Sequence, residues 1–98
     1  MAQPHGFKAV RASVVAALLE GTYQHEARRH VDVKNLLSTG EVSAVDLADV
    51  LRRSDGAGYT RSPLHGGLNI DCHIILASGW YVKFYFIDPV TIFISVHR

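Results

Sequence analysis

The chain has 98 residues, of which 48% are hydrophobic and 19% are charged. This balance excludes an intrinsically disordered chain and predicts a single domain, residues 1–98, with one hydrophobic core. The formal net charge of +1 does not by itself indicate a nucleic-acid-binding protein, so an anion site has to come from local clustering of Lys, Arg and His.

The only cysteine, Cys72, excludes an internal disulfide and fits a reducing compartment. No apolar run approaches the roughly 20 residues that a membrane-spanning helix needs. The apolar stretch at residues 13–19 is followed by Glu20 and Gly21 rather than by a cleavage pattern, so we expect no targeting segment. The sequence therefore predicts a cytoplasmic protein without a membrane partner.

Two helices are expected in the first part of the chain. From Phe7 onward, apolar residues recur at helical spacing, and Gly21 is placed to end this segment. A second helix is expected over residues 25–37, and Gly40 is its stop.

A third helix is expected after Gly40. Ser43 stands at the N-cap position, and Asp46 follows where a capping box has Glu or Gln. The helix should run through Arg53. Residues 59–61 then favour a short edge strand that Pro63 prevents from continuing far.

Residues 68–98 hold most of the aromatic and β-branched residues, cut into three runs by short breaks that contain Gly or Pro. Runs of this kind predict strands, and short breaks predict antiparallel neighbours. The expected fold class is α+β, with two or three N-terminal helices packed on one face of a three- to four-stranded antiparallel C-terminal sheet.

Three-residue connections at residues 77–79 and 88–90 would give this sheet one apolar and one polar face. The apolar face would be formed by Leu68, Ile70, Cys72, Ile74, Leu76, Trp80, Val82, Phe84, Phe86, Ile92, Ile94 and Val96. The polar face would carry Asp71, His73, Tyr81, Lys83, Tyr85, Phe93, Ser95 and His97. His73, Lys83 and Ser95 would then lie in one row, beside a Tyr81–His97 pair.

Such a face has the groups for metal-independent RNA cleavage, in which the 2′-hydroxyl attacks the adjacent phosphate. His73 and His97 could share the acid and base roles, since imidazole titrates near neutral pH. Lys83 could hold the phosphate charge, and Tyr81 could donate a proton or stack on a base. We expect four further residues to bind RNA: Arg61, Tyr85, Ser95 and Arg98.

A metal site is the other interpretation of six histidines. His25 and His30 are five apart, however, and not at the i, i+4 spacing of a ligand pair on one helix face. Of residues 71–73, only Asp71 and His73 would share a face. We therefore expect no metal and no cofactor, and we expect Cys72 to be a small core residue.

Two patches of sequence resemble MqsR-type toxins. Residues 33–42 have the Val-Lys-x-Leu and Gly-x-Val pattern of an early helix and turn in that family. Residues 80–88 and 92–97 are similar to its last hairpin, where a Tyr-x-Lys strand precedes a strand ending in Ser, an apolar residue and a basic residue. The order of helices and strands also resembles the wider RelE-like and barnase–EndoU–colicin ribonucleases.

The resemblance implies an endoribonuclease toxin that is neutralised by a cognate antitoxin. The family's catalytic Tyr falls on Tyr81, and its C-terminal catalytic Lys falls on His97, a change that keeps acid/base capacity but not permanent charge. The alternative is a non-catalytic immunity or antitoxin-like module that binds a partner protein, because polar residues also alternate on ordinary solvent-facing sheets.

Overall fold

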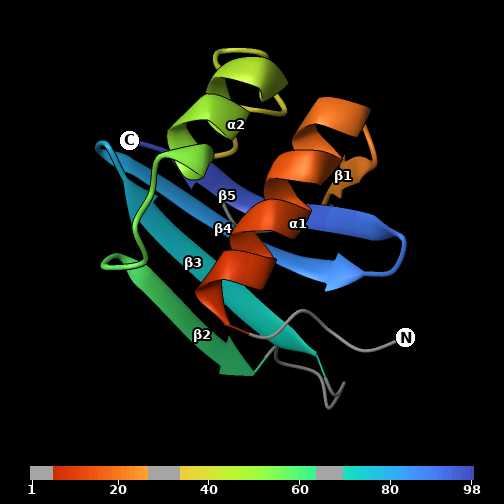
Figure 1. Cartoon of the computed structure of the whole chain (residues 1–98). Helices are drawn as coiled ribbons and strands as arrows, with labels where there is room; N and C mark the ends of the chain where they lie inside the picture. The colour runs from red at the N-terminus through yellow and green to blue at the C-terminus, as the bar shows by residue number, and fades with distance from the viewer. Residues whose placement is uncertain (1–5, 27–33, 64–69) are drawn as a thin grey trace.

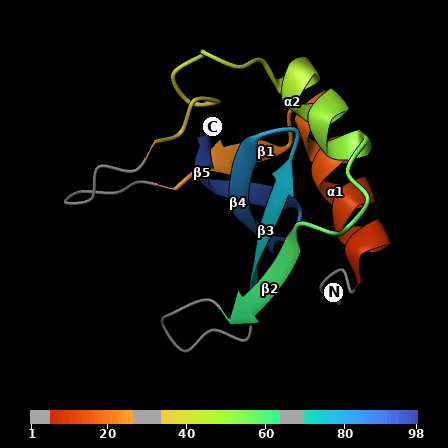
Figure 2. The same cartoon turned by 90° about the vertical axis from the view of Figure 1, so that its left-hand side faces the viewer.

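A computed structural model describes residues 6–26, 34–63 and 70–98. Two helices, α1 (Phe7–Glu20) and α2 (Ala44–Arg52), lie side by side on one face of a five-stranded sheet (Figure 1). The strand order is β1-β5-β4-β3-β2, and the bounds are β1 Tyr23–His25, β2 Tyr59–Pro63, β3 Asp71–Ala77, β4 Trp80–Ile87 and β5 Val90–His97. Both helices cover the same side of the sheet, which leaves the other face without a helix in the described ranges (Figure 2).

The α+β class is confirmed, but the sheet is five-stranded and mixed rather than three- to four-stranded and antiparallel. The difference is β1, which pairs in parallel with β5. The helix predicted for residues 25–37 is wrong at both of its described ends. His25 ends β1, and Asn35 forms a parallel bridge with Val96. Residues 27–33 lie outside the described ranges.

The first predicted helix is confirmed as α1, which buries Val10, Val14, Ala17 and Leu18. It ends where Gly21 takes a left-handed conformation (φ 78°) and its N–H donates to the carbonyl of Ala17. The predicted edge strand is confirmed as β2, which extends as far as Pro63.

The predicted N-cap of α2 is confirmed, since Ser43 Oγ accepts a hydrogen bond from the N–H of Asp46 at 3.1 Å. We expect Ser43→Ala to lower the free energy of unfolding by about 1 kcal/mol, because it leaves a helical N–H without its acceptor. Urea denaturation measures this change. Ser38→Ala is the matched control. This exposed serine donates its main-chain N–H to the Asn35 side chain, and alanine keeps that hydrogen bond.

The β4–β5 hairpin contains both a correct and a wrong part of the predicted register. At the end of the hairpin far from its turn, Tyr81 faces His97, Val82 faces Val96 and Lys83 faces Ser95, as predicted. The turn, however, has two residues, and a β-bulge between Lys83 and Phe84 takes up the difference. Beyond the bulge, Phe93 rather than Ile94 lies opposite Phe84, and Thr91 rather than Ile92 lies opposite Phe86, so Phe93 and Thr91 are buried on the helix side.

The predicted register of β3 is wrong throughout. Ser78 and Gly79 form a two-residue turn, both with positive φ (51° and 81°), as in a type I′ hairpin. Because side chains alternate, this one-residue slip moves the whole strand to the opposite face. His73 and Ile75 therefore point to the helices, and the predicted core residues Ile74 and Leu76 point away from them. Cys72 also points away from the helices, but it is buried, as predicted.

The core lies between the helices and the covered side of the sheet, here called the helix face. β4 presents alternate residues to it, from Trp80 to Phe86, as its sequence predicts. The buried cluster joins α1, α2 and the sheet through Val10, Val14, Leu18, Leu47, Leu51, Ile75, Val82, Phe84, Phe93 and Val96, among others.

Gly58 holds the connection from α2 to β2 against the main chain of Leu76. A Cβ at this position would lie 2.3 Å from the Leu76 carbonyl oxygen, and the Leu76 N–H donates to Gly58 O at 2.9 Å. We expect Gly58→Ala to cost about 1–3 kcal/mol, since the clash is with backbone that cannot rotate away. Thermal and urea unfolding measure the loss, and unchanged stability would contradict the close packing.

Candidate active site

The side of the sheet opposite the helices is here called the open face. Its side chains form rows across three strands, as the strand pairing defines them. From one end of the sheet to the other, the rows are Leu76–Tyr81–His97, Ile74–Lys83–Ser95 and Cys72–Tyr85–Ile92. Four of the predicted site residues, Tyr81, Lys83, Ser95 and His97, therefore occupy two adjacent rows of one face.

Tyr81 and His97 stack on one another, with ring centroids 4.8 Å apart and planes at 15°. The imidazole Nδ1 of His97 lies 3.1 Å from the main-chain oxygen of Arg98. A main-chain oxygen can only accept, so Nδ1 carries the proton in this contact. In the neutral ring, Nε2 is then the nitrogen with the free electron pair, which is what a general base needs.

Lys83 and Ser95 lie one row further along the sheet. Two residues along a strand span about 7 Å, so Lys83 and His97 can act on the same phosphodiester. Tyr85 is two rows from Tyr81, about 13 Å along the strand, and its hydroxyl donates to Glu26 Oε1 at 3.1 Å. Tyr85 is therefore too far from Tyr81 for the two hydroxyl groups to reach a single phosphate.

His73 does not join this group, contrary to the predicted row. Its side chain is 0% exposed on the helix face, between the rings of Tyr59, Phe84 and Phe86. Nδ1 lies 2.8 Å from the Tyr59 hydroxyl, and Nε2 has no hydrogen-bond partner among the described residues. Burial lowers the pKa of His73 to about 4, so the ring is neutral at physiological pH.

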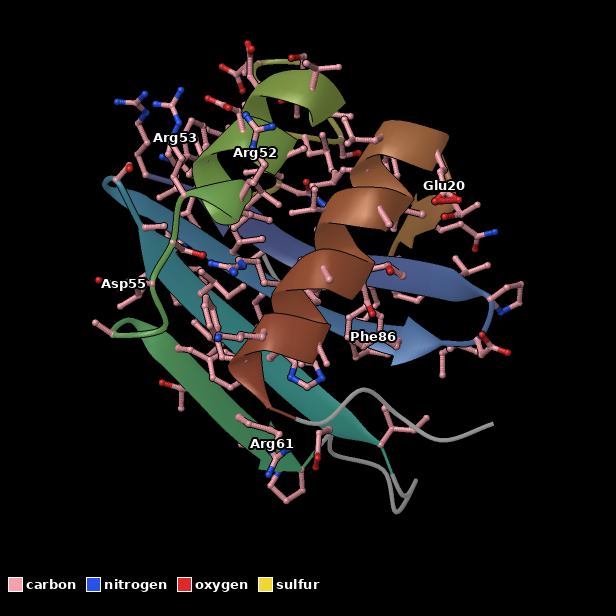
Figure 3. The ribbon with its side chains drawn as sticks, viewed as in Figure 1. Glu20, Arg52, Arg53, Asp55, Arg61 and Phe86 are labelled. Carbon is pink, nitrogen blue, oxygen red and sulfur yellow. The ribbon has the colours of Figure 1, made fainter. Side chains whose placement is uncertain are left out.

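Arg61 also lies away from the open face. It is paired with His73 across β2 and β3, and its Nε is 3.5 Å from Asp71 Oδ2. Figure 3 shows Arg61 at the end of β2 near the start of α1, on the side of the helices. Arg98, in contrast, lies at the same end of the sheet as His97, with its guanidinium 4.8 Å from the centre of the Trp80 ring.

Two features of the open face were not predicted from the sequence. One is its apolar strip along β3, above all Leu76, which is 53% exposed. The Ser78-Gly79 pair was the available signal, because such dipeptides favour two-residue turns that would have set this register. The other is Glu26, which nothing in the local sequence pattern connects with Tyr85.

A cluster of three or more His, Cys, Asp or Glu side chains able to hold a metal ion is absent from the described ranges. His25 forms a hydrogen bond with the Asn35 side chain at 3.0 Å, and His30 lies outside those ranges. Neither described helix has the length and apolar character that a membrane span requires. Comparison of the chain with protein-family models, with curated proteins and with solved structures finds no match.

Proposed function

We propose that this protein is a metal-independent endoribonuclease toxin of a toxin–antitoxin pair and cleaves RNA on the open face. The observation that carries the proposal is the gathering of Tyr81, His97 and Lys83 on adjacent rows of the face that neither α1 nor α2 covers. An acid, a base and a permanent cation within reach of one phosphate are the groups that RNA cleavage without a metal needs.

In the proposed reaction, His97 Nε2 takes the proton of a ribose 2′-hydroxyl. The O2′–P bond forms and the P–O5′ bond breaks, while the Tyr81 hydroxyl donates its proton to the departing 5′-oxygen. Lys83 lies beside the phosphate and offsets the charge that develops on its oxygens. The products are a 2′,3′-cyclic phosphate and a 5′-hydroxyl, and proton exchange with water restores both side chains.

Production of the protein in bacteria tests the proposal. The wild-type chain should arrest growth and cleave cellular RNA, and His97→Ala should relieve the arrest at equal protein level. His25→Ala is the matched control, because this histidine is exposed but lies outside the Tyr81–His97 rows. Normal growth with the wild-type protein, together with intact RNA in a purified reaction, would refute the proposal.

A protein-binding module is the second candidate, and one observation favours it. Leu19 and Val45 are 60% and 65% exposed on the outer side of the helix pair, and they line a hollow of about 220 Å³. Exposed apolar patches of this kind often meet another protein. An antitoxin bound there would fit the first proposal as well, whereas a module alone would bind its partner and leave RNA intact.

A further inference from the structure

A hollow of about 360 Å³ lies where β3 turns into β4, and it is lined by residues 76–81. The turn and the C-terminus lie at the same end of the molecule in both views (Figures 1 and 2). The hollow therefore borders the row that carries the stacked Tyr81 and His97. Its volume is within the range of roughly 300–1,000 Å³ typical of small-molecule sites.

The apolar wall of this hollow is Leu76. Its side chain is 53% exposed on the open face, directly across from Tyr81, which in turn lies across from His97. Ile74 continues the apolar strip one row further along β3. An exposed leucine beside the row proposed to hold the phosphate offers a nucleobase an apolar surface for its ring.

Polar groups come from the turn itself. Within the described part of the chain, the main-chain N–H groups of Ser78 and Gly79 donate no main-chain hydrogen bond, since the sheet pairing stops at Ala77 and Trp80. These peptide groups, with the Ser78 hydroxyl, offer donors and acceptors at the rim of the hollow. Base edges are read by groups of this type.

The positions of the basic side chains indicate where the phosphate and the base of a nucleotide would lie. Lys83 lies on β4, and His97 and Arg98 lie at the end of β5, whereas the β3 positions in the same two rows are Leu76 and Ile74. Phosphate therefore favours β4 and β5, and the base then extends toward β3. Two strand spacings, roughly 10 Å, separate Leu76 from His97, which is the span of one nucleotide from its phosphate to the far edge of its base.

We infer that the hollow at the β3–β4 turn is the nucleobase subsite for the nucleotide whose phosphate lies at His97, with Leu76 as its apolar wall. The inference rests on the proposed ribonuclease function for the identity of the ligand. It makes Leu76 a specificity-determining residue that contacts the base and takes no part in bond cleavage.

Titration of the protein with the four 3′-nucleoside monophosphates, followed by NMR, tests the subsite directly. Signals of the Leu76 methyls and of the Ser78 and Gly79 amides should shift, and the affinity should differ among the four bases. Ribose 5-phosphate should move signals near Lys83 and His97 but not the Leu76 methyls. Equal Leu76 shifts with ribose 5-phosphate and with the nucleotides, or no Leu76 shift at all, would overturn the inference.

Variants at Leu76 give a second measurement. Leu76→Ala should weaken binding of the preferred nucleotide about five- to tenfold, and should raise KM for RNA by the same factor without changing kcat. Leu76→Tyr should restore or tighten binding because it offers a stacking ring. Ile87→Ala, at an exposed apolar residue at the opposite end of β4, should change neither.

The two proposals fail in distinguishable ways. If purified protein leaves RNA intact but binds nucleotides at Leu76 with a base preference, the subsite stands and the cleavage proposal falls. If RNA is cleaved and Leu76→Ala has wild-type KM and base preference, the subsite is wrong and the cleavage proposal stands.

Discussion

His97→Ala is expected to slow RNA cleavage by at least about 100-fold, which is the usual contribution of a general base. The loss should appear in kcat, because in the proposed reaction His97 takes the 2′-hydroxyl proton during bond formation and does not contribute to RNA binding. Single-turnover cleavage of a defined oligonucleotide measures it. His25→Ala should retain the wild-type rate.

Tyr81→Phe separates chemistry from packing at the same pair. Phenylalanine keeps the stack on His97, which has a centroid distance of 4.8 Å in the wild-type protein, but removes the hydroxyl. A fall in kcat with unchanged stability would identify Tyr81 as the group that donates a proton to the departing 5′-oxygen. Wild-type rates in both His97→Ala and Tyr81→Phe would place the chemistry elsewhere.

The second large effect concerns His73 and the pH dependence of stability. Burial lowers the pKa of His73 to about 4 in the folded protein, whereas an imidazole in the unfolded chain titrates near 6.5. Between these values the unfolded chain binds a proton that the folded protein does not. The free energy of unfolding therefore falls as the pH drops, by about 3 kcal/mol in total and by about 2 kcal/mol between pH 7 and pH 5.

Urea unfolding of the wild-type protein and of His73→Phe at pH 7 and pH 5 measures this contribution. Phenylalanine cannot take up the proton, so most of the loss should disappear in the variant. His25→Phe, the same substitution at an exposed histidine, should leave most of the pH-dependent loss of stability in place. Parallel pH curves for wild type and His73→Phe, or an NMR titration of His73 with a midpoint near 6.5, would contradict the buried neutral ring.

The end of α1 and the start of α2 were predictable because they depend on short-range chemistry, whereas the helix predicted for residues 25–37 was wrong. Ser43 can cap only the N–H groups that follow it, and Gly21 can adopt the left-handed conformation that ends α1. The faces of β4 were also predictable, since its alternation of large apolar and polar residues matches a strand buried on one side. β1 was not predictable, because its three residues gain their strand conformation from pairing with β5, about seventy residues later in the chain.

The prediction of the candidate site depended on the lengths of the two hairpin turns. For this reason its β4 and β5 residues were predicted correctly and its β3 residue was not. Tyr81, Lys83, Ser95 and His97 were placed together correctly, because a shorter turn and the bulge before Phe84 displace β5 by compensating amounts. β3 has no such compensation, so the Ser78-Gly79 turn moved His73 into the core and Leu76 onto the open face. The alternation of side chains along a strand divides its residues between two faces. The length of the turn then determines which residues of neighbouring strands lie on the same face.

Cleavage of an RNA oligonucleotide in the presence of EDTA tests the central claim most directly, with a second oligonucleotide that carries one 2′-deoxy residue at the mapped cleavage site. If the 2′-hydroxyl attacks with His97 as the base, the all-ribose strand is cut to a 2′,3′-cyclic phosphate and a 5′-hydroxyl. The 2′-deoxy strand should then resist, and His97→Ala should cut the all-ribose strand at least about 100-fold more slowly than the wild-type protein. Equal cleavage of both strands, a requirement for a divalent metal, or no cleavage by the wild-type protein would contradict the proposed active site.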